Sequence, residues 1–157
     1  MPGDSSEQVL GWVERVADFC AEQYGMPPIT GRILGWLMIC DPPEQSAAEI
    51  AAAIGASRAS LTTNVRLLTA GQYVRRRTRP GERTARYRID EDAWRRAVRR
   101  KLASLESFRA ITGDGLALLG PDTERAKRIN DAHETFRWLA ELVTPPVKPP
   151  ESTDPPR

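Results

Sequence analysis

Residues 46–71 read SAAEIAAAIGASRASLTTNVRLLTAG, and this stretch carries the strongest fold signal in the chain. The first serine can accept a hydrogen bond from the backbone amide of Glu49 while the Glu49 carboxylate reaches back, a capping box that starts a short helix. Gly55 ends that helix, and after a tight turn Ser57 can cap a second helix that stops at Gly71. Two short helices joined by a tight turn that contains glycine predict a helix-turn-helix.

A hairpin is predicted directly after this motif. Tyr73 to Thr78 and Thr84 to Ile89 read as strands, and the sequence RPGER over residues 79–83 reads as the turn between them. In the second strand apolar residues alternate with arginines, which gives one face toward the core and one basic face. A helix-turn-helix followed by a hairpin predicts a winged helix.

Helical patterns flank the winged helix on both sides. The expected helices run from Ser6 to Tyr24, Thr30 to Cys40, Glu91 to Ile111 and Pro121 to Val143, the last with Pro121 at its first position. Residues 144–157 hold six of the thirteen prolines and no apolar pattern, so we expect a disordered tail. The fold class is therefore mainly α with a small β-hairpin wing.

Charge is unevenly distributed along the 157 residues, although the formal net charge is only +2. Residues 57–110 carry 15 Lys or Arg and 5 Asp or Glu, a balance of +10. The rest of the chain carries 8 basic and 16 acidic residues, a balance of −8. A strongly basic middle between acidic flanks predicts a polyanion as the partner.

The second helix of the motif has an apolar face and a polar face. The apolar spacing predicts that the core side contains Leu61, Val65 and Leu68. The opposite face carries Ala59, Thr62, Thr63 and Arg66, with Arg58 near the start. Arginine can bind guanine in bidentate fashion, and threonine can offer its hydroxyl or its methyl to a base. This inventory is typical of a recognition helix in the major groove, and the free amides near Ser57 can bind a phosphate.

The predicted hairpin carries seven arginines in the fourteen residues from 75 to 88. Arg79 and Arg83, at the tip of the wing, can reach a backbone phosphate or the minor groove. A solvated face is the alternative, because the whole chain uses 20 Arg and only 3 Lys. The basic residues of the next helix either flank the DNA backbone or are solvated.

Several other classes of protein are disfavoured by what the sequence lacks. No apolar run approaches the roughly 18 residues that a membrane helix needs, and the start does not read as a signal peptide, so a cytoplasmic location is the default expectation. Cys20 and Cys40 lack CxxC spacing, His133 is the one histidine, and neither nucleotide-binding glycine motif occurs. We therefore expect no enzyme, no metal and no cofactor. The two cysteines could form a redox switch, but their places on apolar stripes favour buried, inert thiols.

Four stretches together resemble the GbsR-like branch of the MarR-type winged-helix regulators: GMPPITGRILGWL over 25–37, SAAEI over 46–50, SRASLTTNVRLL over 57–68, and PGER over 80–83 with Tyr87. The resemblance covers about Gly25 to Ile89. It implies a homodimeric transcription factor, usually a repressor, that its N- and C-terminal helices hold together. Members named for glycine betaine control respond to choline-type ligands, which leaves room for a small-molecule effector.

The predicted domains are a dimerisation helix over 1–26, the winged helix over 27–90, dimerisation helices over 91–143 and the tail over 144–157. The predicted function is a homodimeric, sequence-specific regulator that binds an inverted-repeat operator in double-stranded DNA. Its predicted DNA-binding residues are Ser57, Arg58, Thr62, Thr63, Arg66, Arg77, Arg79 and Arg83.

Two alternative functions are also consistent with the basic middle of the chain. An architectural protein would coat DNA without choosing a sequence, and it needs no face that reads bases. A protein-interaction module would use the winged helix to bind another protein, and it would not respond to DNA.

Overall fold

The computed structural model describes residues 6–120 and 122–143. The chain divides into two compact units, residues 1–93 and residues 94–157. Pro121 and the predicted proline-rich tail lie outside the described residues.

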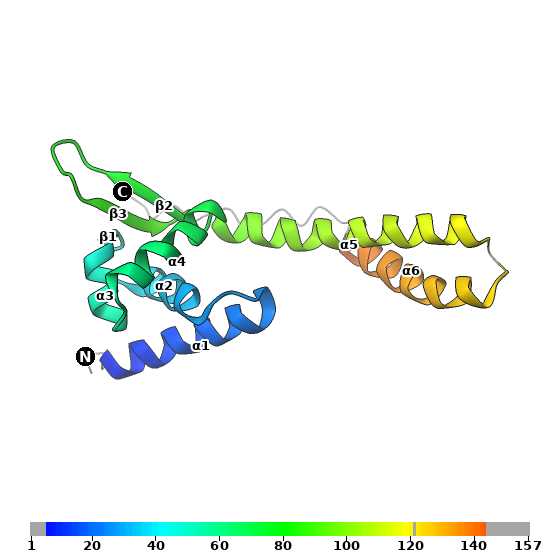
Figure 1. The fold of residues 1–157 in the computed structure, drawn as a ribbon, viewed down its shortest axis with the longest axis horizontal. Helices are drawn as coiled ribbons and strands as arrows, with labels where there is room; N and C mark the ends of the chain where they lie inside the picture. The colour runs from blue at the N-terminus through cyan, green and yellow to red at the C-terminus, as the bar shows by residue number, and fades with distance from the viewer. Residues whose placement is uncertain (1–5, 121, 144–157) are drawn as a thin grey trace. The chain divides into compact units, whose positions relative to one another are not determined.

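The first unit has the architecture of a winged helix (Figure 1). Its elements are α1 (Ser6–Tyr24), α2 (Pro28–Ile39), β1 (Gln45–Ser46), α3 (Ala47–Ile54), α4 (Arg58–Ala70), β2 (Val74–Thr78) and β3 (Ala85–Ile89). The three strands form an antiparallel sheet in the order β1-β3-β2. The predicted mainly helical fold with a hairpin wing is confirmed. Strand β1 was not predicted, because two residues are too few to show an alternating pattern.

The core of this unit is built around α2. Ile33 and Leu34 are completely buried among side chains of the neighbouring helices. Helix α1 lies very close to α2, since a Cβ added at Gly31 would be 2.7 Å from the Cα of Ala17. Helix α2 begins at Pro28, two residues earlier than expected, because proline is well suited to the first helical position, where no backbone donor is needed.

The ends of α3 and α4 follow the predicted capping chemistry with one exception. Ser46 and Glu49 form the complete capping box, and Gly55 ends α3 in the left-handed region with φ of 67°. Ser57 caps α4 by accepting from the amide of Ser60 at 3.2 Å. Gly71 follows α4 as expected, but its φ is −74°, and Gln72 takes the left-handed conformation with φ of 61°.

The second unit contains α5 (Ala93–Leu119) and α6 (Glu124–Val143). The expectation that α5 ends at Ile111 is wrong, because the helix continues through two glycines that read as helix breakers. A Cβ at Gly113 would lie 3.4 Å from the His133 ring, and one at Gly115 would lie 3.4 Å from Ile129. Both glycines therefore face α6 from within α5, where a Cβ would be in ordinary van der Waals contact with that helix.

Helix α6 begins at Glu124, three residues later than expected. The Oγ1 of Thr123 accepts a hydrogen bond from the amide of Ala126 at 3.0 Å, which gives this helix its N-terminal cap. Among the described helices, none combines the length and apolar character needed to cross a membrane.

Candidate nucleic-acid interface

Helix α4 is fixed in orientation by apolar and polar contacts with the core. Leu61, Val65 and Leu68 are buried, as their spacing predicts. Asn64 lies on the same buried face, where its Oδ1 accepts from Thr30 of α2 at 2.7 Å and its Nδ2 donates to the carbonyl of Ser60. This pair satisfies polar groups that would be costly to bury alone, and it ties the predicted recognition helix to α2. Asn64 is not among the predicted core residues, although its position between Leu61 and Val65 places it on the apolar face.

The opposite face of α4 presents the predicted contact residues to solvent. Arg58, Thr62, Thr63 and Arg66 are all exposed. The hydroxyl of Thr62 donates to the carbonyl of Arg58 at 2.9 Å, and that of Thr63 donates to the carbonyl of Ala59 at 3.3 Å. Each threonine can therefore offer a methyl group and a hydroxyl oxygen as acceptor.

Ser57 and the two arginines of α4 differ in whether their side chains form hydrogen bonds or ion pairs within the described residues. The Ser57 oxygen accepts the capping bond, which leaves its O–H free to donate outward. The side chains of Arg58 and Arg66 form no ion pair or hydrogen bond with any described residue. Both guanidinium groups are thus available for a ligand.

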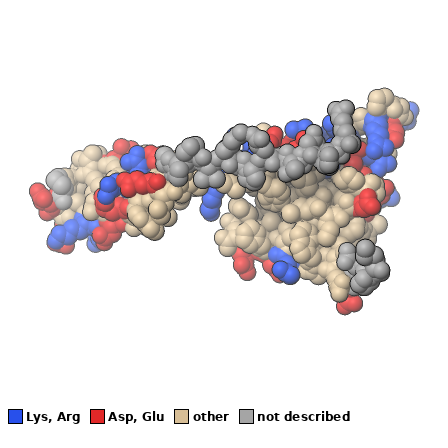
Figure 2. All heavy atoms as spheres, turned by 180° about the vertical axis from the view of Figure 1, so that it is seen from behind, with Lys and Arg blue, Asp and Glu red and all other residues tan. Residues whose placement is uncertain are grey.

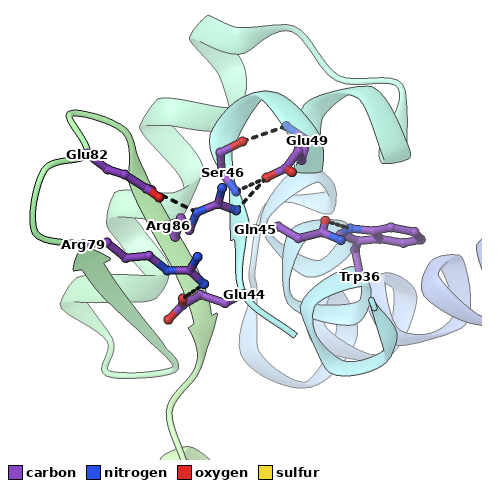
Figure 3. A network of polar contacts seen from close by, with 8 residues as sticks. All are labelled: Trp36, Glu44, Gln45, Ser46, Glu49, Arg79, Glu82 and Arg86. Carbon is purple, nitrogen blue, oxygen red and sulfur yellow. Dashed lines mark hydrogen bonds and ion pairs between the residues drawn. The ribbon is translucent and has the colours of Figure 1, made fainter. Parts of the chain in front are cut away.

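The seven hairpin arginines fall into two groups. Four are paired with carboxylates: Arg75 with Asp90, Arg79 with Glu44, Arg86 with Glu49 and Glu82, and Arg88 with Glu91. Within the described part of the chain, three form no ion pair: Arg76, Arg77 and Arg83. Figure 3 shows the pairs made by Arg79 and Arg86, and Figure 2 shows basic and acidic side chains side by side over the hairpin.

The strand register explains why so many carboxylates surround the hairpin. Arg75 lies directly opposite Arg88, and Arg77 lies directly opposite Arg86. Like charges in opposite positions destabilise a strand pair, and the carboxylates around them offset this repulsion. Of the three predicted wing residues, Arg77 and Arg83 are exposed and unpaired with described residues, whereas Arg79 is held by Glu44 at 3.0 Å.

Two pKa effects bear on the site and on the cysteines. Hydrogen bonds from Ser46, together with the nearby Arg86 guanidinium, lower the pKa of Glu49 and keep it ionised next to the hairpin. Burial raises the pKa of the Cys20 thiol, and burial also raises that of Cys40. A raised pKa lowers the fraction of reactive thiolate, which disfavours the redox-switch alternative.

A cavity of about 480 Å³ lies between α4 and the hairpin. Its lining includes Thr62 and Arg66 from α4, Arg76 from β2 and Tyr87 from β3. Arg76 and Tyr87 are not among the predicted DNA-binding residues. The signal was present in the alternation of β2, since Arg76 shares a sheet face with the buried Val74 and therefore points toward the helices. Among the described residues, no group of three His, Cys, Asp or Glu side chains could hold a metal ion.

The fold and this cationic face define a winged-helix protein. Residues 24–83 match the family model for the MarR family, and residues 92–144 match the model for MmpR5-like MarR family transcriptional regulators. The HTH-type transcriptional regulator MmpR5 of Mycobacterium tuberculosis (strain ATCC 25618 / H37Rv) is 26% identical over 87% of this chain and 82% of its own length. A crystal structure described as that of a transcriptional regulator superimposes with a TM-score of 0.64 at 26% identity, covering 86% of this chain and 92% of the other. Over these residues the chain is similar to MarR-family winged-helix transcriptional regulators.

Proposed function

We propose that this protein is a homodimeric regulator that binds an inverted-repeat operator in double-stranded DNA. The observation that carries the proposal is the exposed face of α4, where two unpaired arginines flank two threonines on a helix held rigidly by its buried side. Arginine and threonine on such a face can read base edges in the major groove. Ser57, Arg58, Thr62, Thr63 and Arg66 are assigned to the contact of α4 with DNA.

The hairpin supplies the second part of the proposed DNA contact. Arg77 and Arg83 are exposed and free of described partners, so they can bind phosphates without first breaking an ion pair. Arg79 can bind DNA only in competition with Glu44. This division makes the wing a phosphate-binding element whose contribution falls as salt rises.

Dimerisation is proposed through the terminal helices. Large apolar side chains remain exposed on α5 and α6, including Val98, Ile111, Leu118, Trp138 and Leu142. Exposed apolar surface of this kind is typical of a protein–protein interface, and a second copy of the chain is the proposed partner. Two-fold symmetry then predicts operator half-sites about one helical turn apart.

Salt dependence and one substitution test the proposal. With on the order of 8 phosphate contacts per dimer, the slope of log affinity against log salt is expected near −7. Arg58→Ala should weaken binding to the operator more than binding to random DNA, because a base contact discriminates between the two. Absence of binding to any duplex DNA at low salt would instead favour a protein-interaction module. Equal binding to every sequence would favour an architectural protein.

Membership of the GbsR-like branch is also part of the proposal. Residues 25–37 and 57–68 carry the resemblance to the GbsR-like branch, and with it repression and a response to a small-molecule effector. A reporter gene placed behind the operator should become more active when the regulator is deleted. Lower reporter activity after deletion would contradict repression.

A further inference from the structure

The cavity between α4 and the hairpin is lined in part by Thr62 and Arg66 of the proposed α4 contact, and in part by Arg76 and Tyr87, which have no role in it. Arg66 and Arg76 line it from opposite elements, and Tyr87 lines it from β3. Neither guanidinium forms an ion pair with a described residue, and the Tyr87 hydroxyl has no hydrogen-bond partner among the described residues. One cavity thus brings together two available cations and one available hydroxyl.

This arrangement differs from that of the other hairpin arginines. Arg75, Arg79, Arg86 and Arg88 each have a carboxylate of this chain as counter-ion. Two like charges that share a cavity repel each other, and an anion bound between them converts the repulsion into attraction. The chemistry of the lining therefore fits a phosphate group.

The register of the hairpin selects Arg76 for this role. Arg76 pairs with Tyr87 across the strands, and Arg77 pairs with Arg86. Because successive side chains of a strand point to opposite faces, Arg76 and Tyr87 share the face that packs toward the helices. Val74 on that face is only 2% exposed, which identifies it as the inner face.

The shape of DNA indicates which phosphate would reach this cavity. A sugar–phosphate strand separates the major groove of B-form DNA from the adjacent minor groove. A protein that places α4 in the major groove and the hairpin tip over the minor groove must therefore accommodate that strand between them.

We propose that the cavity between α4 and the hairpin receives the sugar–phosphate strand that separates the two grooves. Arg66 and Arg76 bind phosphate oxygens of this strand, and the Tyr87 hydroxyl donates to one of them. This assignment rests on the proposed function. It adds Arg76 and Tyr87 to the interface and makes Arg66 a phosphate ligand rather than a reader of bases.

The first test compares Arg76→Gln with the wild type on an operator duplex and on a random duplex, across a series of salt concentrations. Loss of one phosphate contact should make the slope of log affinity against log salt shallower by about 0.9 for each bound protomer. The fold-loss should be equal on both duplexes, because a phosphate contact carries no sequence information. Tyr87→Phe should also weaken binding to both duplexes equally, with a smaller change in slope.

The matched control is Arg15→Gln, which removes the same charge from an exposed position of α1 that has no ion pair with a described residue. Its slope should equal that of the wild type. An unchanged slope for Arg76→Gln, in a protein whose circular dichroism is intact, would overturn the assignment. A loss confined to the operator would also overturn it.

A second arm separates the DNA strand from a free anion as the ligand. Melting temperatures are compared in inorganic phosphate and in chloride at equal ionic strength. The assignment predicts the altered salt slope for Arg76→Gln. A free-anion site would give a different result. Phosphate would stabilise the wild type but not Arg76→Gln, and the salt slope for DNA binding by Arg76→Gln would be unchanged. This result would overturn the assignment. A wild type that binds no duplex DNA would contradict the proposed function itself, whereas wild-type DNA binding with an unaffected Arg76→Gln contradicts the strand assignment alone.

Discussion

Arg79 shows how one acidic residue can limit a proposed DNA contact. Its Nη2 lies 3.0 Å from the Oε2 of Glu44, a residue that precedes β1 and is distant in the sequence. The Arg79 side chain is 55% exposed, whereas that of Glu44 is 15% exposed. A phosphate must therefore compete with an ion pair that is already formed on the protein.

Glu44→Gln is expected to raise affinity for operator and random duplexes alike. Removal of the carboxylate releases Arg79 for a phosphate, so the slope of log affinity against log salt should steepen by about 0.9 for each protomer. Fluorescence anisotropy over a salt series measures this change.

The control for this prediction is Glu22→Gln. It makes the same change of charge at an exposed position of α1 that has no ion pair with a described residue. Weaker binding by Glu44→Gln would mean that Glu44 holds Arg79 in place for DNA rather than away from it. Equal effects of both substitutions on affinity would mean that the change depends only on the net charge of the protein.

The pairing of individual arginines could not be predicted from the sequence. The run of arginines located the hairpin and its charge, and all eight predicted contact residues are exposed. The partners of Arg75 and Arg79 lie 15 and 35 positions away, in elements that only the folded chain brings near. Which hairpin arginines form ion pairs with carboxylates therefore depends on the tertiary structure.

At the scale of elements, the close contact of α1 with α2 depends on Gly31. A Cβ at this position would lie 2.7 Å from the Cα of Ala17, so the two helix backbones must move apart to accommodate it. Gly31→Ala should lower the free energy of unfolding by about 1–3 kcal/mol, as overpacking of a core does. Chemical denaturation monitored by circular dichroism measures the loss.

Gly11→Ala in α1 is the matched comparison, since a Cβ there meets nothing within 4 Å. Alanine restricts the unfolded chain more than glycine does, so this variant should be stabilised by up to about 1 kcal/mol. Equal stabilities for the two variants would contradict the close helix contact.

The capping box of α3 predicts a dependence of stability on pH. Glu49 has a pKa below its ordinary value of 4.5, because Ser46 donates hydrogen bonds to it and Arg86 lies near. Because the pKa of Glu49 is lower in the folded state, the ionised carboxylate stabilises the protein at pH values above its ordinary pKa. This stabilisation disappears as the pH falls through the folded-state pKa. The difference in melting temperature between wild type and Glu49→Gln should therefore shrink on acidification from pH 6 to about pH 3. A constant difference would contradict the role of the Glu49 charge.

Element boundaries were predicted well where capping is local. The ends of α3 depend on Ser46, Glu49 and Gly55, and each residue acts within a single turn. The end of α5 was predicted wrongly, because Gly113 and Gly115 lie inside the helix and face α6. A sequence pattern cannot show whether a glycine lies inside a helix beside a neighbouring helix or ends the helix in a turn.

At the scale of the whole molecule, the proposed dimer accounts for the exposed apolar side chains of α5 and α6. Ile111 is 62% exposed on α5. Ile111→Glu should shift the protein from dimer to monomer and lower operator affinity, because a buried charge without a partner is costly in an interface. Analytical ultracentrifugation measures the shift.

Asn130→Glu on α6 is the control, because it adds the same charge at an exposed polar position. It should leave the dimer intact. A wild-type protein that sediments as a monomer at all concentrations would contradict the proposed dimer.

The uneven charge of the chain also bears on specificity at this scale. A balance of +10 over residues 57–110 covers the proposed recognition helix and the wing, and the remaining residues balance to −8. Several hairpin arginines are further neutralised by carboxylates of the chain itself. Both features limit indiscriminate attraction to DNA, which favours a regulator that selects a sequence over a protein that coats DNA.

Selection of bound sequences from a pool of random duplex DNA tests this account most directly. The account predicts enrichment of an inverted repeat whose half-sites are about one helical turn apart, since each protomer places α4 in a major groove. Recovery of bound DNA without any enriched sequence would contradict it.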